Sequence, residues 1–124
     1  MTRSGANYGQ TACFKYNFDV YACADVLILR TNKKAISGGY LSTFFNTKQG
    51  KLLVERGGYG GAQPHIAPSY LKKLRIPRFS KLEPLINNLV SLSVQTQEQS
   101  QTAYTTAENL LLDALGLDAN TLAD

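Results

Sequence analysis

The chain has 124 residues, of which 44% are hydrophobic and 18% charged, and its formal net charge is +4. This length allows one compact domain with a modest core, and the composition is that of a folded protein rather than a disordered one. No apolar run is long enough to cross a membrane, and the N-terminus lacks a signal-peptide pattern, so we expect a cytoplasmic protein.

The charges divide unevenly along the chain. Residues 1–80 carry twelve Lys or Arg and three acidic residues, a net charge of +9, whereas residues 81–124 carry a net charge of −5. A basic body attracts polyanions such as DNA, because each neutralised phosphate releases condensed counterions. An acidic tail is repelled by DNA and is better suited to meeting protein. The charge pattern alone leaves nucleic-acid binding and a merely solvated basic surface about equally open.

The pattern of the first 34 residues predicts two strands. Residues 1–10 are small and polar, so a frayed terminus is expected. Residues 12–18 alternate between apolar and polar side chains, which predicts a half-buried strand. The unbroken apolar run before Arg30 predicts a second strand over residues 26–30, buried on both faces and ended by a polar turn at 31–34. Cys13 and Cys23 form no disulfide framework, and with one histidine there are too few ligands for a zinc site, so two reduced thiols are expected.

Residues 37–77 change to helical spacing and then to turns. Ser37 is a suitable N-cap for one or two helices between about residues 39 and 56, with a break at Gly50. The four glycines within residues 57–61 predict a loop, since they cannot hold a helix or a strand. A single helical turn is expected over residues 67–73 with Pro68 near its start, followed by a short strand over 74–77.

The last part predicts one long helix over roughly residues 81–115. Ser80 and Glu83 have capping-box spacing, and Gly116 is placed to end the helix. Side chains at alternating steps of four and three residues form a heptad-like seam, apolar at both ends and small and polar in the middle. A helix of roughly 45–50 Å cannot be buried by so small a body, so it needs a partner helix. The apolar and small residues assigned to pairing are Leu82, Ile86, Leu89, Ala103, Ala107, Leu110 and Ala114.

Several of these segments, taken in order, carry a family resemblance. They are the Tyr-Leu-Ser-Thr-Phe-Phe-Asn-Thr run of 40–47, Gly50, Glu-Arg-Gly at 55–57, Ala-Gln-Pro-His-Ile at 62–66, residues 71–77 ending in Ile-Pro, and residues 81–117. The series resembles the closing half of a target-recognition domain in the specificity subunit of bacterial Type I restriction–modification systems, and in related specificity regions fused to adenine-N6 methyltransferases. The final segment resembles one arm of the coiled-coil spacer in that family.

The resemblance implies an α+β protein in two parts. Residues 1–78 would be the C-terminal part of a DNA target-recognition domain with a small mixed β body and short helices, and residues 79–124 the spacer helix. Because the family's recognition domain has a larger N-terminal part, we expect a piece of a longer subunit. The implied partners are double-stranded DNA, a DNA methyltransferase (modification) subunit, a restriction subunit, and a second copy or another specificity half that pairs through the long helix.

The candidate DNA-binding residues combine basic side chains at turns with two polar ones. Basic side chains contact phosphates, and a glutamine can read adenine in the major groove. Each has a plainer alternative: a solvated surface for the basic residues, a structural hydrogen bond for His65, and a simple turn for the neighbouring glycines. The candidates are Arg30, Lys33, Lys34, Arg56, Gln63, His65, Lys72, Lys73 and Arg75.

The sequence favours a protein without catalysis of its own. It contains no Asn/Asp-Pro-Pro-Tyr segment to hold a flipped adenine, no Gly-x-Gly cofactor fingerprint and no Asp…Glu-x-Lys nuclease pattern. We therefore expect no catalytic residue, metal or cofactor, with the chemistry left to a partner subunit or to another part of a longer polypeptide. The alternative function is a protein-assembly module that uses the long helix and has no direct role at DNA.

Overall fold

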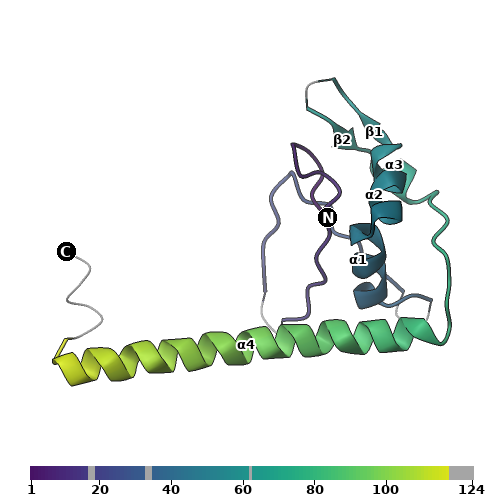
Figure 1. The fold of residues 1–124 in the computed structure, drawn as a ribbon. Coiled ribbons are helices and arrows are strands. Elements are labelled where there is room, and N and C mark those ends of the chain that lie inside the picture. Colours follow the sequence, from purple (N-terminus) through teal and green to yellow (C-terminus); the bar gives the residue numbers. More distant parts are fainter. Residues whose placement is uncertain (17–18, 33–34, 62, 118–124) are drawn as a thin grey trace. The chain divides into compact units, whose positions relative to one another are not determined.

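The computed structural model describes residues 1–16, 19–32, 35–61 and 63–117. Its elements are α1 (Gly38–Asn46), α2 (Lys48–Glu55), β1 (Gly58–Tyr59), β2 (His65–Ile66), α3 (Pro68–Leu71) and α4 (Leu82–Leu115) (Figure 1). Contacts divide the chain into a unit from Met1 to Ser91, here called the body, and a second unit from Leu92 onward. The predicted α+β class, with a small sheet, short helices and one long C-terminal helix, is confirmed.

Two capped helices occupy the segment where helical spacing was predicted. The Ser37 side chain accepts a hydrogen bond from the Tyr40 N–H and caps α1, as expected. The Thr47 side chain accepts from the Gly50 N–H and caps α2. The predicted break at Gly50 is therefore wrong, because the chain turns at Thr47. Position 50 lies inside α2 and must be glycine, because a Cβ there would be only 2.0 Å from the Phe44 carbonyl oxygen.

The glycine-rich segment forms half of a β-hairpin, so the prediction of a plain loop is wrong. β1 and β2 pair antiparallel, with Gly58 opposite Ile66 and Tyr59 opposite His65. Gly60 makes the hairpin possible because its φ of 94° is open to glycine at no steric cost. Each strand has only two residues, so the ladder is short, and Gly58 weakens it without preventing it.

The N-terminal residues extend this sheet on its other side. Ser4 forms an antiparallel bridge with His65, and Thr2 forms one with Val26. The Met1 amino group donates to the Leu27 carbonyl, and the Met1 side chain is buried in the core. The expectation of a frayed terminus is wrong, since backbone hydrogen bonds hold this segment between two distant parts of the chain.

Three predicted strands are absent from the described residues, for different reasons. Beside residues 12–16, the backbone of Thr11 pairs with the Asn46 side chain instead of a strand, and residues 17–18 lie outside the described part. Residues 26–30 pair only at Val26, and Ile28 is 61% exposed, so the run is not buried on both faces. Residues 74–77 have no partner strand among the described residues, although two of their side chains pack on the core.

The core of the body is small and combines residues that are far apart in the sequence. Val54 of α2 and Ile66 of β2 are fully buried, and Met1 and Phe45 join them. The predicted helical turn at Pro68 is confirmed as α3, with proline in its first turn. The core thus connects α1, α2 and the sheet into one support for the hairpin.

The long helix is confirmed as α4, and it ends as predicted. The Leu117 N–H bonds the Leu112 carbonyl and the Gly116 N–H bonds the Asp113 carbonyl, with Gly116 at a φ of 67°. These bonds form a Schellman motif. The predicted capping box differs in its partner: the Glu83 carboxylate accepts from the Phe79 N–H at 2.9 Å rather than from Ser80.

Candidate nucleic-acid interface

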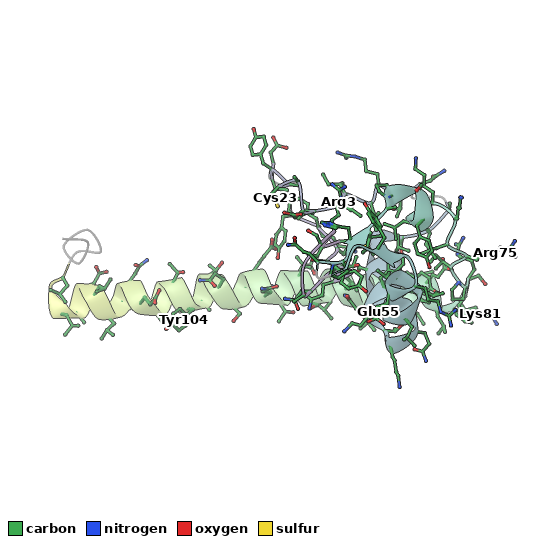
Figure 2. The ribbon with its side chains drawn as sticks, turned by 90° about the horizontal axis from the view of Figure 1, so that it is seen from above. Arg3, Cys23, Glu55, Arg75, Lys81 and Tyr104 are labelled. Atoms are coloured by element: carbon green, nitrogen blue, oxygen red, sulfur yellow. The ribbon has the colours of Figure 1, made fainter. Side chains whose placement is uncertain are left out.

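Four of the predicted DNA-binding residues follow the ends of α2 and α3 and are exposed. Arg56 is the C-cap of α2 and Lys72 is the C-cap of α3, with Lys73 and Arg75 directly after it. The Arg75 side chain points outward from the body in Figure 2. We call Arg56, Lys72, Lys73 and Arg75 the basic cluster.

Packing between α2 and α3 positions the basic cluster. The Tyr70 hydroxyl donates to the Leu53 carbonyl at 2.6 Å, and a Cβ on Gly57 would lie 2.1 Å from the Tyr70 ring. Only glycine fits there, so the chain after α2 lies directly against α3. Arg56 and Lys72 are therefore presented from one joint beside the β1–β2 hairpin.

Among the described residues, no carboxylate forms an ion pair with the basic cluster. In the part of the chain that the structure describes, the ion pair found joins Arg78 to Glu83 instead. Exposed cations that no ion pair engages are available to attract a polyanion. The cluster can therefore contact phosphates.

The other predicted contact residues are distributed differently. Arg30 is exposed at the end of the segment that follows the Val26 bridge. Gln63 is exposed in the turn of the hairpin, and His65 is half-buried in β2. Lys33 and Lys34 lie outside the described residues.

The outer face of the hairpin carries an aromatic pair that the sequence did not suggest. Ile66 points into the core, so its neighbour His65 points to the opposite side of the sheet, as does Tyr59 across from it. The two ring centroids are 5.9 Å apart with an interplanar angle of 38°, and Tyr59 remains 53% exposed. Tyr59 could not be recognised in the sequence because it sits among glycines; only the register places it beside His65.

Ser4 and Asp25 lie near His65 without forming a catalytic arrangement. The Ser4 hydroxyl donates to the Asp25 carboxylate, so the serine proton is directed away from the histidine. Nucleophilic catalysis needs the reverse order, with the base accepting from the serine and the carboxylate orienting the base. A search of the described residues found no group of three or more His, Cys, Asp or Glu that could hold a metal ion, and Cys13 and Cys23 are free thiols.

Polar contacts that could not be predicted from the sequence join the first turns of α4 to the preceding part of the body. The Lys15 ammonium donates to the Asn87 side-chain and backbone oxygens, at 3.1 and 3.2 Å, and to the Ser91 hydroxyl. A Cβ on Gly39 would be 2.7 Å from the Asn87 side-chain oxygen, so α1 and α4 approach closely there. These contacts direct one face of the first turns of α4 toward the body.

A second attachment lies just before α4. The Arg78 guanidinium forms two hydrogen bonds of 2.7 Å to the Glu83 carboxylate, which lower the pKa of Glu83. The Tyr40 hydroxyl donates to the Pro77 carbonyl at 2.7 Å. Burial, together with the charge of Glu83, raises the pKa of Tyr40.

The predicted pairing residues of α4 are mostly exposed. Leu82, Leu89 and Leu110 are 50%, 65% and 66% exposed, the three alanines of the set are exposed too, and Ile86 is half-buried. Leaving this many leucines in water is unfavourable, because each buried methylene is worth about 0.8 kcal/mol. The exposed row is compatible with a coiled-coil helix.

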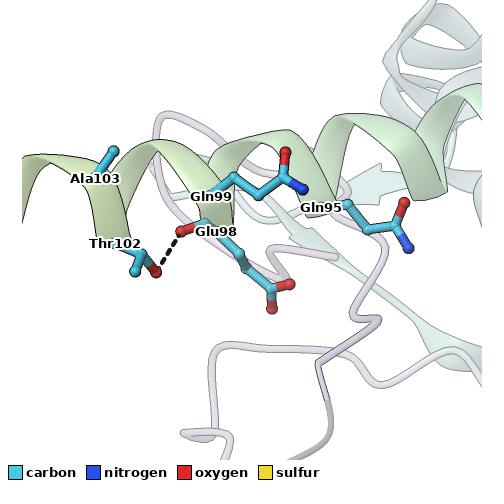
Figure 3. Close-up of a pocket in the computed structure, with 5 residues that line it drawn as sticks. All are labelled: Gln95, Glu98, Gln99, Thr102 and Ala103. Carbon is cyan, nitrogen blue, oxygen red and sulfur yellow. Dashed lines mark hydrogen bonds between the residues drawn. The ribbon is translucent and has the colours of Figure 1, made fainter.

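A shallow hollow along the middle of α4 is too open to bind a small molecule. It is lined by Gln95, Glu98, Gln99, Thr102 and Ala103, all from this one helix (Figure 3). The Thr102 hydroxyl donates to the Glu98 carbonyl at 3.0 Å and is thereby occupied. Ligand pockets enclose most of their ligand, which the surface of a single helix cannot do.

Comparisons with protein-family models, with curated proteins and with solved structures found no match for this chain. Within the described residues, no helix combines the length and the apolar character that crossing a bilayer requires.

Proposed function

We propose that this chain binds DNA through its body and pairs through α4, and that it positions a separate DNA methyltransferase on its target. The observation that carries the proposal is the basic cluster: Arg56, Lys72, Lys73 and Arg75 are exposed and without an ion pair in the described chain. Cations presented from helix ends and turns are the usual source of phosphate contacts.

The family resemblance supports the methyltransferase partner. The resemblance to the Type I specificity subunit implies that methylation, and cleavage by a restriction subunit, occur in other polypeptides. The second unit supports a protein-facing role, because its described residues include Glu98, Glu108 and Asp113 and no Lys or Arg. DNA repels such a surface, whereas a partner helix can cover it.

A salt titration of duplex binding tests the proposal with a matched control. The dissociation constant should be about 10⁻⁴–10⁻⁶ M at physiological salt, and the affinity should fall as the salt concentration rises. The variant Lys72→Ala/Lys73→Ala should bind more weakly and flatten the log–log salt slope by up to about one unit per lost phosphate contact. The control, Lys48→Ala/Lys51→Ala, removes the same charge from exposed positions of α2.

The two variants separate local contact from diffuse attraction. If the control leaves the slope nearly unchanged while the Lys72/Lys73 variant flattens it, the basic cluster touches phosphate. Equal effects would mean general attraction by net charge. A wild-type slope near zero would remove the DNA role altogether.

The exposed leucines of α4 favour a second candidate, a protein-assembly module without a DNA role. This candidate predicts the zero slope just described, together with self-association through α4. The proposed function predicts both a negative slope and pairing, so the salt titration decides between them.

A further inference from the structure

We propose that Tyr59, supported by His65, is a stacking contact for an unpaired nucleobase, in an inference that rests on the proposed DNA-binding function. The contact would lie on the outer face of the β1–β2 hairpin, beside the basic cluster. Its ligand class is single-stranded DNA or a DNA segment with a base out of the stack.

The first support is the orientation of the pair. The register places Tyr59 and His65 opposite each other, on the side of the sheet away from the buried Ile66. Ser4 pairs with His65 on the other edge of β2, so its side chain lies on the outer face. The side chain of the adjacent residue, Arg3, lies on the inner face, and its Nε is buried. The hairpin therefore separates an inner, packed face from an outer face on which half of Tyr59 is accessible.

The second support is the contact between the Tyr59 and His65 rings. His65 lies against one side of Tyr59, with ring centroids 5.9 Å apart, and β2 is bonded on both edges, to β1 and to the N-terminal segment. A side chain that already has a packing partner loses less conformational entropy on binding a ligand than one without such a partner. An exposed, supported ring is the element that base stacking requires.

The third support is charge complementarity. Arg56 precedes Tyr59 by three residues, and the Gly57–Tyr70 contact brings α3, with Lys72 and Lys73 at its end, to the base of the same hairpin. Phosphates on either side of a stacked base would meet these cations. Single-strand binding surfaces combine the same two parts, a cationic track and aromatic rings.

An unpaired base fits this surface better than a duplex does. The ring sits on the flank of a short hairpin and is tilted by 38° against His65. Bases in a duplex are already stacked on each other, so their faces are not available to it. Bases in a single strand or at an unpaired site offer an open face, which predicts a preference for such DNA.

The experiment uses the full chain and an oligothymidylate of about 12 nucleotides, within the roughly 4–16 nucleotides that one such surface covers. One central residue is 2-aminopurine, whose fluorescence is quenched by stacking. Tyr59→Ala should weaken binding about five- to 150-fold and abolish the quenching, without changing the salt slope. Tyr59→Phe keeps the ring and should retain both, whereas Tyr59→Leu keeps apolar bulk and should lose the quenching.

Tyr104→Ala is the matched control, since Tyr104 is a comparably exposed tyrosine on α4 with no basic neighbour in that unit. It should bind like the wild type. If Tyr59→Ala binds and quenches like the wild type while Lys72→Ala/Lys73→Ala is weakened, the stacking inference is wrong and the proposed function stands. If Tyr59→Phe loses as much as Tyr59→Ala, a hydroxyl contact replaces stacking and the inference also fails. If the wild type binds no DNA, the proposed function itself fails.

Discussion

Gly50 is the position at which one methyl group should do most damage to the body. It lies in the first turn of α2, where the turn at Thr47 brings the end of α1 back against it. A Cβ at Gly50 would lie 2.0 Å from the Phe44 oxygen and 2.7 Å from the Phe45 Cα. Both atoms belong to the backbone, so no side-chain rotation relieves the overlap. Gly50→Ala must therefore force α1 and α2 apart.

Two opposing effects set the size of the change. Alanine is the better helix former, by about 0.5–1 kcal/mol. Overpacking that moves backbone costs typically about 1–3 kcal/mol and occasionally more. The overlap here is deep and involves fixed atoms, so the steric effect wins, with a net loss of about 1–2 kcal/mol or more. For a unit of this size, each kcal/mol lowers Tm by about 4–8 °C.

Thermal unfolding followed by circular dichroism measures this loss. Gly61→Ala is the control, because a Cβ there has no neighbour within 4 Å and the residue has no positive φ. That substitution should be neutral, or stabilise by about 0.4–1 kcal/mol through the unfolded state. If Gly50→Ala is as stable as the control, Gly50 is not pressed against the end of α1 and the steric argument is wrong.

Three further outcomes are expected. Leu110→Glu should shift the chain toward monomer in light scattering at tens-of-micromolar concentration, because it places a charge in the heptad seam. Asn109→Glu adds the same charge off the seam and should not have this effect. A monomeric wild type would contradict pairing through α4. The lowered pKa of Glu83 contributes stability at pH values above the ordinary carboxyl range, and this stability is lost as pH falls through the lowered value. Glu83→Gln should therefore reduce the loss of folding stability at acid pH. If the stability–pH profile of Glu83→Gln is the same as that of the control Glu98→Gln, this role of Glu83 is contradicted. Purified alone, the chain should neither methylate nor cut unmethylated duplex with S-adenosylmethionine, ATP and Mg²⁺, measured by methyl counting and gel analysis; activity that disappears in His65→Ala would overturn this.

The helices could be read from the sequence because their signals are local. Ser37, Pro68 and Gly116 mark helix ends through hydrogen bonds or φ angles within a few residues of themselves. A helical hydrogen bond joins residues four apart, so a short window of sequence contains both partners. The exposure of Arg56 and Lys72 was predictable for a related reason, since charged side chains stay in water unless paired.

The sheet and the aromatic pair depended on tertiary structure. Thr2 finds its partner at Val26 and Ser4 at His65, and no local window contains both members of either pair. The alternating pattern of residues 12–16 was compatible with a strand, but a strand exists only where a second backbone satisfies its hydrogen bonds. Tyr59 lies among glycines that favour a loop, and pairing with His65 across the hairpin overrides that preference. Local propensity therefore determined the helices and their caps, while the register of the hairpin decided which residues share its outer face and contacts between distant segments placed the N-terminal residues beside Val26 and His65.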